Sequence, residues 1–181
     1  MQQYVVRPAR AADAQAYVGC HLECLAETYR DVMPPAFFQE QRRAGPASVG
    51  QLRQDLDAPA DAAAPPATAW LALDPLGGVV GVARSAASRQ HWEDELGAPA
   101  APVALQLQHI YTRRSTHGTG LGQALLDAAV GGRDAYLWIL GGNARAERFY
   151  RRNGFRPDGV QLLCGPTWFY RPQFRMVRVR G

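Results

Sequence analysis

The sequence contains no lysine, so its 20 basic side chains are all arginine, against 16 acidic residues. The resulting formal charge is +4, and the arginines are scattered along the chain. The exception is a group of arginines near the C-terminus, at Arg171, Arg175, Arg178 and Arg180. A protein that follows a nucleic-acid backbone needs a basic stripe or patch. We therefore expect no nucleic-acid partner.

Cysteine is scarce and long apolar runs are absent. Three cysteines do not make a disulfide framework, and Cys20, His21 and Cys24 lack the second ligand pair of a structural zinc site, so no metal is expected. No apolar run reaches the roughly 18 residues of a membrane span. The start, Met1-Gln2-Gln3-Tyr4, has neither the cationic nor the apolar segment of a signal peptide. These absences predict a reduced, cytoplasmic protein with no membrane partner.

The apolar spacing predicts a single domain over residues 1–181, and 47% apolar residues are enough for a core. The first half is expected to begin with a strand at 4–8, followed by helices at 11–30, 36–43 and 48–56. A loop at 58–67 should then lead to a hairpin of strands 68–73 and 79–86, and a long polar segment at 88–102 follows the hairpin. The second half is expected to contain a strand at 103–112, a helix at 120–130, a strand at 135–140, a helix at 143–152 that ends at Asn153-Gly154, and strands at 160–164 and 174–180. This order predicts an α/β protein with a mixed sheet and helices on both faces.

A glycine-rich turn, His117-Gly118-Thr119-Gly120-Leu121-Gly122, separates the strand at 103–112 from the following helix. Glycine lets the backbone approach a bulky anion, and the free N–H groups at a helix start carry partial positive charge. The turn therefore indicates phosphate binding, although a turn that only redirects the chain would have the same glycines. Gln123 stands where a dinucleotide fingerprint has its third glycine, and no P-loop lysine follows.

Further motifs follow in order: Ala124-Leu125-Leu126 after the turn, then a strand, Asn143, Phe149-Tyr150 and Asn153-Gly154-Phe155. Together with the turn, these motifs resemble the GNAT superfamily of acetyl-CoA-dependent N-acetyltransferases. The resemblance is firm over about 103–156 and extends loosely over the whole chain. It implies a mixed, mostly antiparallel sheet of about six to seven strands, with a splayed central pair that binds acetyl-CoA.

The resemblance also assigns cofactor-binding residues by position. They are Ile110, Tyr111, Thr112, His117, Gly118, Thr119, Gly120, Leu121, Gly122 and Asn143. His117 departs from the family pattern, which usually has Arg or Gln there, because histidine keeps a donor but not a fixed charge. Arg113 and Arg114 are either substitutes for the missing cation or solvated surface residues.

The same resemblance makes Tyr150 the general acid, since a phenol with a reference pKa of about 10 stays protonated at neutral pH. The base is less defined. Gln106 stands where many members carry a carboxylate, and the side of the strand that His109 faces depends on the position of a bulge. An ordered water, or an amine that arrives deprotonated, is the preferred alternative.

Glu27, Tyr29 and Trp138 are the residues expected to bind the acceptor. Glu23, Glu27 and Asp31 recur every four residues and form either an acidic stripe that attracts a cationic amine or a solvated helix face. The aromatic residues either wall the acceptor pocket or pack in the core.

The implied function is transfer of an acetyl group from acetyl-CoA to a primary amine of a small molecule or peptide, by direct attack in a ternary complex. A homodimer is compatible with the sequence. The alternative is a catalytically silent acyl-CoA-binding module with a regulatory or interaction role, which Gln106 and His117 favour and Tyr150 opposes. O-acetyl or longer acyl transfer also stays open, because the sequence fixes neither the acceptor nor the acyl length.

Overall fold

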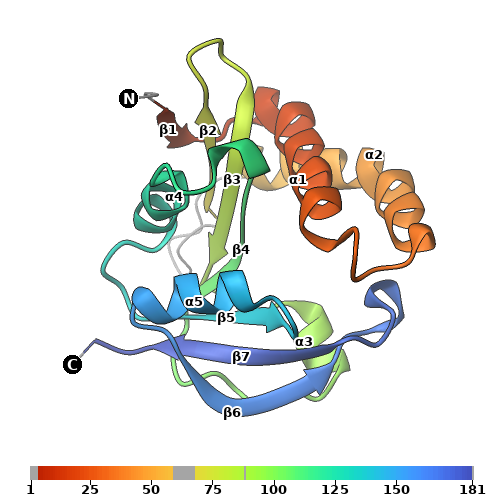
Figure 1. Cartoon of the computed structure of the whole chain (residues 1–181), viewed down its shortest axis with the longest axis vertical. Helices are drawn as coiled ribbons and strands as arrows, with labels where there is room; N and C mark the ends of the chain where they lie inside the picture. Colours follow the sequence, from red (N-terminus) through yellow and green to blue (C-terminus); the bar gives the residue numbers. More distant parts are fainter. Residues whose placement is uncertain (1–3, 59–67, 88, 181) are drawn as a thin grey trace.

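The computed structural model describes residues 4–58, 68–87 and 89–180, and these form a seven-stranded sheet with helices on both faces (Figure 1). The strands are β1 (Val5–Pro8), β2 (Thr68–Leu73), β3 (Val79–Ala86), β4 (Gln106–Thr112), β5 (Ala135–Leu140), β6 (Arg156–Leu163) and β7 (Pro172–Arg178). Their order across the sheet is β1-β2-β3-β4-β5-β7-β6. Every neighbouring pair is antiparallel except β4 and β5, which are parallel. The predicted mixed, mostly antiparallel sheet is therefore confirmed.

The helices lie on opposite faces of this sheet. They are α1 (Ala14–Tyr29), α2 (Pro35–Asp57), α3 (His91–Glu95), α4 (Leu121–Ala129) and α5 (Ala144–Arg152). In Figure 1, α1 and α2 lie on one side of β2 to β4 and α4 lies on the other. Within the described residues, no helix combines the length and the apolar character that a membrane crossing requires.

Strand alternation divides the core between the two faces. Ala72 and Ala83 pack with Leu121 and Leu125 under α4, whereas the adjacent Leu71 and Val82 pack with residues of α1 and α2. The core on the α4 face also includes Tyr150 of α5. The turn that links β4 to α4 is thus mounted on a packed core.

Helix α2 corrects one prediction, because it is a single helix where the sequence predicted two, at 36–43 and 48–56. Pro46 lies inside it, and proline normally interrupts a helix because it lacks an N–H and crowds the preceding turn. The buried face nevertheless continues across the proline through Gly45, Val49 and Leu52. Packing of this face against α1 explains why the helix does not stop.

Most other predicted elements are confirmed, with ends that shift by a few residues. The hairpin at 68–73 and 79–86 and the strand at 135–140 match β2, β3 and β5. The short helix α3 was not predicted within the polar segment at 88–102. Apart from Ala58, the predicted loop at 58–67 lies outside the described residues.

Candidate active site

Strands β4 and β5 separate almost as soon as they meet. Gln106 and Tyr136 are their one register pair, while β5 continues along β7 for its whole length. The other side of β4 carries a β-bulge, because Arg84 pairs with His109 and Ser85 pairs with Leu107, which leaves Gln108 without a partner on β3. The predicted splayed pair is therefore present, and we call the Gln106–Tyr136 junction the fork.

The bulge reverses the alternation of β4. Leu107 and Ile110 both pack on the α4 face, although they are three residues apart, and His109 and Tyr111 face α1. The Nε2 atom of His109 lies 2.8 Å from the Tyr17 hydroxyl, which also donates to the Ala83 carbonyl. Burial holds the pKa of His109 well below its ordinary value. His109 is thus tied into the packing of β4 and is a weak base.

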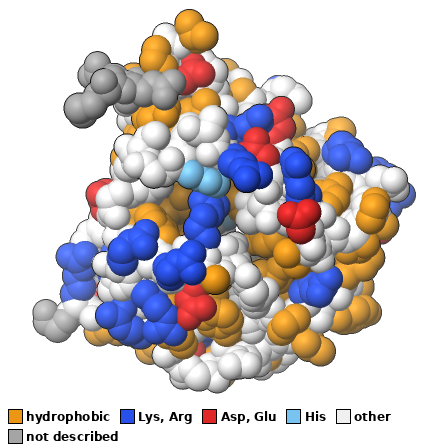
Figure 2. Space-filling model, viewed as in Figure 1, with side chains coloured by type: hydrophobic (Ala, Val, Ile, Leu, Met, Phe, Trp, Pro, Cys, Tyr) orange, Lys and Arg blue, Asp and Glu red, His pale blue; other side chains and the backbone are white. Residues whose placement is uncertain are grey.

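A cavity of about 410 Å³ lies between the end of β4, the glycine-rich turn and α5. Figure 2 shows the hollow in the face of the molecule, bordered by arginine side chains. The described lining residues are Thr28, Ile110, Tyr111, Thr112, Thr116, His117, Gly118, Gly120, Gly122, Gln123, Asn143, Arg145, Ala146, Phe149, Tyr150 and Arg152. None of these is acidic, so the cavity favours anionic ligands.

The turn presents its backbone to this cavity because two glycines adopt left-handed conformations. Gly118 has φ of +81° and Gly120 of +88°, and a Cβ on either would have no atom within 4 Å. Helix α4 begins directly after Gly120. The arrangement suits the diphosphate of acetyl-CoA, which needs close backbone approach and free N–H groups at a helix start.

Two predicted cofactor-binding residues do not line the cavity. Leu121 is 2% exposed and packs in the core under α4. The Thr119 hydroxyl donates to the Thr116 carbonyl at 2.7 Å. The other predicted cofactor-binding residues all lie in the cavity wall.

Asn143, the N-cap residue of α5, and Tyr150 both line the cavity. The Asn143 side chain caps the helix by accepting the Ala146 N–H at 3.1 Å. Tyr150 is 8% exposed, and its burial raises the pKa of the phenol well above the ordinary value. The phenol therefore keeps its proton at neutral pH.

Tyr29 meets the cavity residues from α1. It is buried, which raises the pKa of its phenol, and the nearby side chains of Tyr111 and Asn143 act against this rise. Its ring packs edge-on against Trp168 at 5.9 Å in a mainly apolar cluster. The structure therefore places Tyr29 beside the cavity wall, on the side formed by α1.

Two residues of the acidic stripe on α1, Glu23 and Glu27, form contacts with Arg113 and Arg114. Arg113 forms ion pairs with Glu23 and, at 3.1 Å, with Glu27. The second oxygen of Glu27 accepts the backbone N–H of Arg114 at 2.6 Å. Asp31 lies beyond the end of α1. These contacts fasten α1 to the turn and compensate the charge that was expected to attract an amine.

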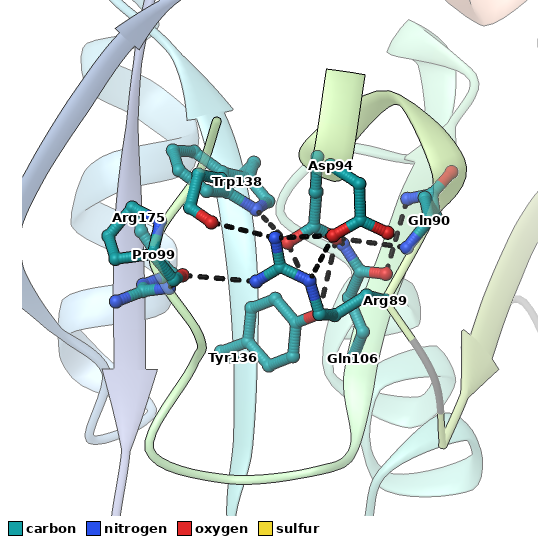
Figure 3. Close-up of polar contacts among 10 residues, drawn as sticks. Arg89, Gln90, Asp94, Pro99, Gln106, Tyr136, Trp138 and Arg175 are labelled. Atoms are coloured by element: carbon teal, nitrogen blue, oxygen red, sulfur yellow. Dashed lines mark hydrogen bonds and ion pairs between the residues drawn. The ribbon is translucent and has the colours of Figure 1, made fainter. Parts of the chain in front are cut away.

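Trp138 lies away from the cavity, in a polar cluster around the buried Glu93 of α3 (Figure 3). Glu93 is 0% exposed, and it accepts Gln106 Nε2 at 2.8 Å, the Tyr136 hydroxyl at 3.2 Å and Trp138 Nε1 at 3.1 Å. Alternation along β5 explains the position, because Leu137 and Ile139 face the α4 and α5 core while Tyr136 and Trp138 face α3. This carboxylate, which sequence reasoning did not single out, holds both strands of the fork.

Sequence reasoning also missed cavity residues on α5. Arg145, Phe149 and Arg152 line the cavity at a spacing of four and three residues, which places them on one side of α5. That spacing was a usable signal. Thr28 gave none, because only the packing of α1 brings it to the cavity.

Cys20 and Cys24 are both buried, with their sulfur atoms 3.9 Å apart. No group of three or more His, Cys, Asp or Glu side chains that could hold a metal occurs in the part of the chain that the structure describes.

A forked, mostly antiparallel sheet with a glycine-rich turn at its open end is the arrangement of the GNAT fold. Residues 65–157 match the family described as the acetyltransferase (GNAT) domain. The chain therefore belongs to the GNAT acetyltransferase family. No curated protein matches the sequence.

Solved structures agree with this fold over the whole chain. The PaiA N-acetyltransferase of Thermoplasma acidophilum, in complex with coenzyme A, is 14% identical with a TM-score of 0.67, covering 98% of this chain and 99% of its own. An acetyltransferase of the GNAT family from Streptococcus pneumoniae is 18% identical with a TM-score of 0.64, over 99% and 100% of the two chains. A Corynebacterium glutamicum protein described as a histone acetyltransferase and related acetyltransferase is 24% identical with a TM-score of 0.62, over 100% and 98%. At these identities the likeness shows the fold alone.

Proposed function

We propose that the chain transfers an acetyl group from acetyl-CoA to a primary amine by direct attack in a ternary complex. One observation carries the proposal: the buried Tyr150 phenol faces the same cavity as the glycine-rich turn. The similar PaiA structure was solved with coenzyme A, and coenzyme A carries a diphosphate that fits the turn. The acceptor is a small-molecule or peptide amine.

The residues divide the work between binding and proton transfer. The turn from His117 to Gly122 and the free edge of β4 would hold the diphosphate and the pantetheine amides. Acetyl-CoA supplies the thioester, whose C–S bond breaks as the amine nitrogen forms a bond to the acetyl carbon. Tyr150 donates its proton to the departing sulfur, because its buried phenol is protonated and close to the cavity.

Deprotonation of the amine is left to solvent or to the amine's own equilibrium. The described cavity wall offers no carboxylate, Gln106 donates to Glu93, and His109 is buried with a lowered pKa. With the cofactor saturating, kcat/KM for the acceptor should therefore rise with pH until the pKa of the acceptor amine is reached.

The sequence-based expectations of a single domain, a cytoplasmic location and a homodimer stay predictions.

Thiol release from acetyl-CoA in the presence of polyamines, aminoglycosides, amino acids and peptides tests the proposal. Tyr150→Phe should lower turnover with an active acceptor by about 100-fold and leave acetyl-CoA binding unchanged. Binding of acetyl-CoA without thiol release with any acceptor would instead support a silent acyl-CoA-binding module. Unchanged turnover in the variant would assign the acid role to another group.

A further inference from the structure

His117 is the titratable residue of the anion-binding turn. It follows the short 3-10 turn η2 (Arg114–Thr116), and its backbone N–H is bonded to the Arg114 carbonyl at 3.2 Å. Its side chain lines the cavity together with Gly118, Gly120 and Arg145. A ligand diphosphate held by the turn would therefore meet the imidazole ring.

The protonation state of the His117 ring decides what it can offer an anion. The nearby backbone of Thr112 acts to raise the pKa of His117. A neutral imidazole has one N–H and one lone pair. The neutral ring therefore offers an anion one donor and no charge, and its lone pair repels a phosphate oxygen. The imidazolium has a second N–H to donate.

The charges around the ring keep it neutral when no anion is present. Partial burial lowers the pKa of His117 below the ordinary value, as do Arg145 on α5 and Arg114 in the same turn. Glu27 on α1 acts in the opposite direction, but it is already shared with Arg113 and the Arg114 N–H. An anion placed between His117 and Arg145 would instead raise the pKa of His117.

We propose that this protein binds the diphosphate of coenzyme A together with one proton, which is taken up from solvent by His117. The charged ring donates an N–H to a phosphate oxygen, beside Arg145, which lines the same cavity. Arg113 does not supply this cation, because it pairs with Glu23 and Glu27. This inference rests on the proposed function, since it needs the diphosphate to lie in the turn.

The sign of the pH dependence follows from the uptake. Binding stabilises the protonated ring, so the pKa of His117 is higher in the complex than in the free protein. Affinity is greatest below the free pKa and falls as pH rises towards the pKa of the complex, by up to about tenfold per pH unit. Above the pKa of the complex it is constant and weaker.

The probe is dephospho-CoA, which keeps the diphosphate but lacks the 3′-phosphate, a group that itself titrates at about pH 6. Calorimetric titrations at about pH 7, in buffers of different ionisation enthalpy, should show uptake of up to one proton. Titrations from about pH 6 to pH 8 should show weakening affinity. S-acetylpantetheine, which has no diphosphate, should show neither effect.

Two variants isolate the ring. His117→Arg supplies a permanent cation, and His117→Gln supplies a neutral donor, so both should bind dephospho-CoA without proton uptake. His117→Arg should bind more tightly than the parent at about pH 8. Uptake that persists in His117→Gln, or binding to the parent with no uptake and no pH dependence, would overturn the inference alone. Failure of the parent to bind at any pH would overturn the proposed function as well.

Discussion

The two ends of β4 differ in how they use polar groups. At the fork, Gln106 is 1% exposed and its amide is bonded to the buried Glu93, which also holds Tyr136 and Trp138 of β5. At the other end, Ile110 to Thr112 have left β5 and form a cavity wall. One end is fastened by satisfied hydrogen bonds, and the other offers a free strand edge.

The difference shows how a sheet can hold an open cleft in its middle. A strand edge left unpaired tends to recruit a partner, so separation of two central strands requires contacts that fix where it begins. Here the Glu93 cluster fixes the fork, while the bulge at Gln108 and the Tyr17–His109 contact fix the direction of β4 beyond it. Variants at the two ends should therefore affect stability and binding separately.

The largest effect is expected at the fastened end. Glu93→Leu would leave the buried donors of Gln106, Tyr136 and Trp138 unpaired, at a cost on the order of 3 to 5 kcal/mol in the free energy of unfolding. Urea denaturation measures this cost. Glu95→Gln, in the same helix but with an exposed side chain paired only with His91 on the surface, is the matched control and should change little. If Glu93→Leu lowered the free energy of unfolding by less than about 1 kcal/mol, the Glu93 cluster would not be what fixes the fork.

The open end should respond in binding rather than in stability. Gly122→Val would add bulk in the cavity wall, and its Cβ would meet the Phe149 ring at 3.7 Å, an ordinary contact. Acetyl-CoA affinity should fall by on the order of 100-fold, or about 2.7 kcal/mol, with little change in unfolding. Gly120→Val is a less clean test, because its φ of +88° adds backbone strain. Calorimetric titration decides, and an unaltered affinity would place the diphosphate elsewhere.

The middle of β4 should make the fold sensitive to acid. Burial lowers the pKa of His21 to about 4 and that of His109 well below its ordinary value, and their rings stack at 4.6 Å. Both are therefore neutral when folded, so their stabilisation is complete above the unfolded pKa of about 6.5 and is lost as pH falls from there. The slope is roughly 1.4 kcal/mol per pH unit for one histidine. Urea unfolding between about pH 7 and pH 4 should show the free energy of unfolding falling with pH. The slope should be smaller in His109→Gln, and an equal slope in that variant would contradict this account.

The smallest effect is expected from the acidic residues of α1. Glu23 and Glu27 pair with Arg113, and the Glu23 side chain is 62% exposed, so their pairs contribute about 0 to 1 kcal/mol. Replacing both by Gln should change the KM of an active acceptor by less than about twofold, at low and at high salt. A large rise in KM that disappears in high salt would show instead that the stripe attracts a cationic amine.

Local patterns predicted most of the fold, because they depend on neighbouring residues. The hairpin, the βαβ unit and the end of α5 at Asn153-Gly154 follow from alternation, helical spacing and glycine. The predictions that were wrong or incomplete depended on distant contacts. Helix α2 passes Pro46 because α1 covers its apolar face, and Trp138 faces α3 because the rest of β5 belongs to another core.

The sequence by itself determined the glycine-rich turn and the short helix α5 with its cap at Asn143. A left-handed glycine before a helix and an asparagine that caps the next helix depend only on neighbouring residues. The tertiary structure alone decided which arginine lines the cavity beside the turn. Arg113 lies closer in sequence to the glycines, but α1 brings Glu23 and Glu27 to it, whereas α5 brings Arg145 to the cavity. A long charged side chain goes to whichever partner the packing of helices places within its reach, and no local pattern records that choice.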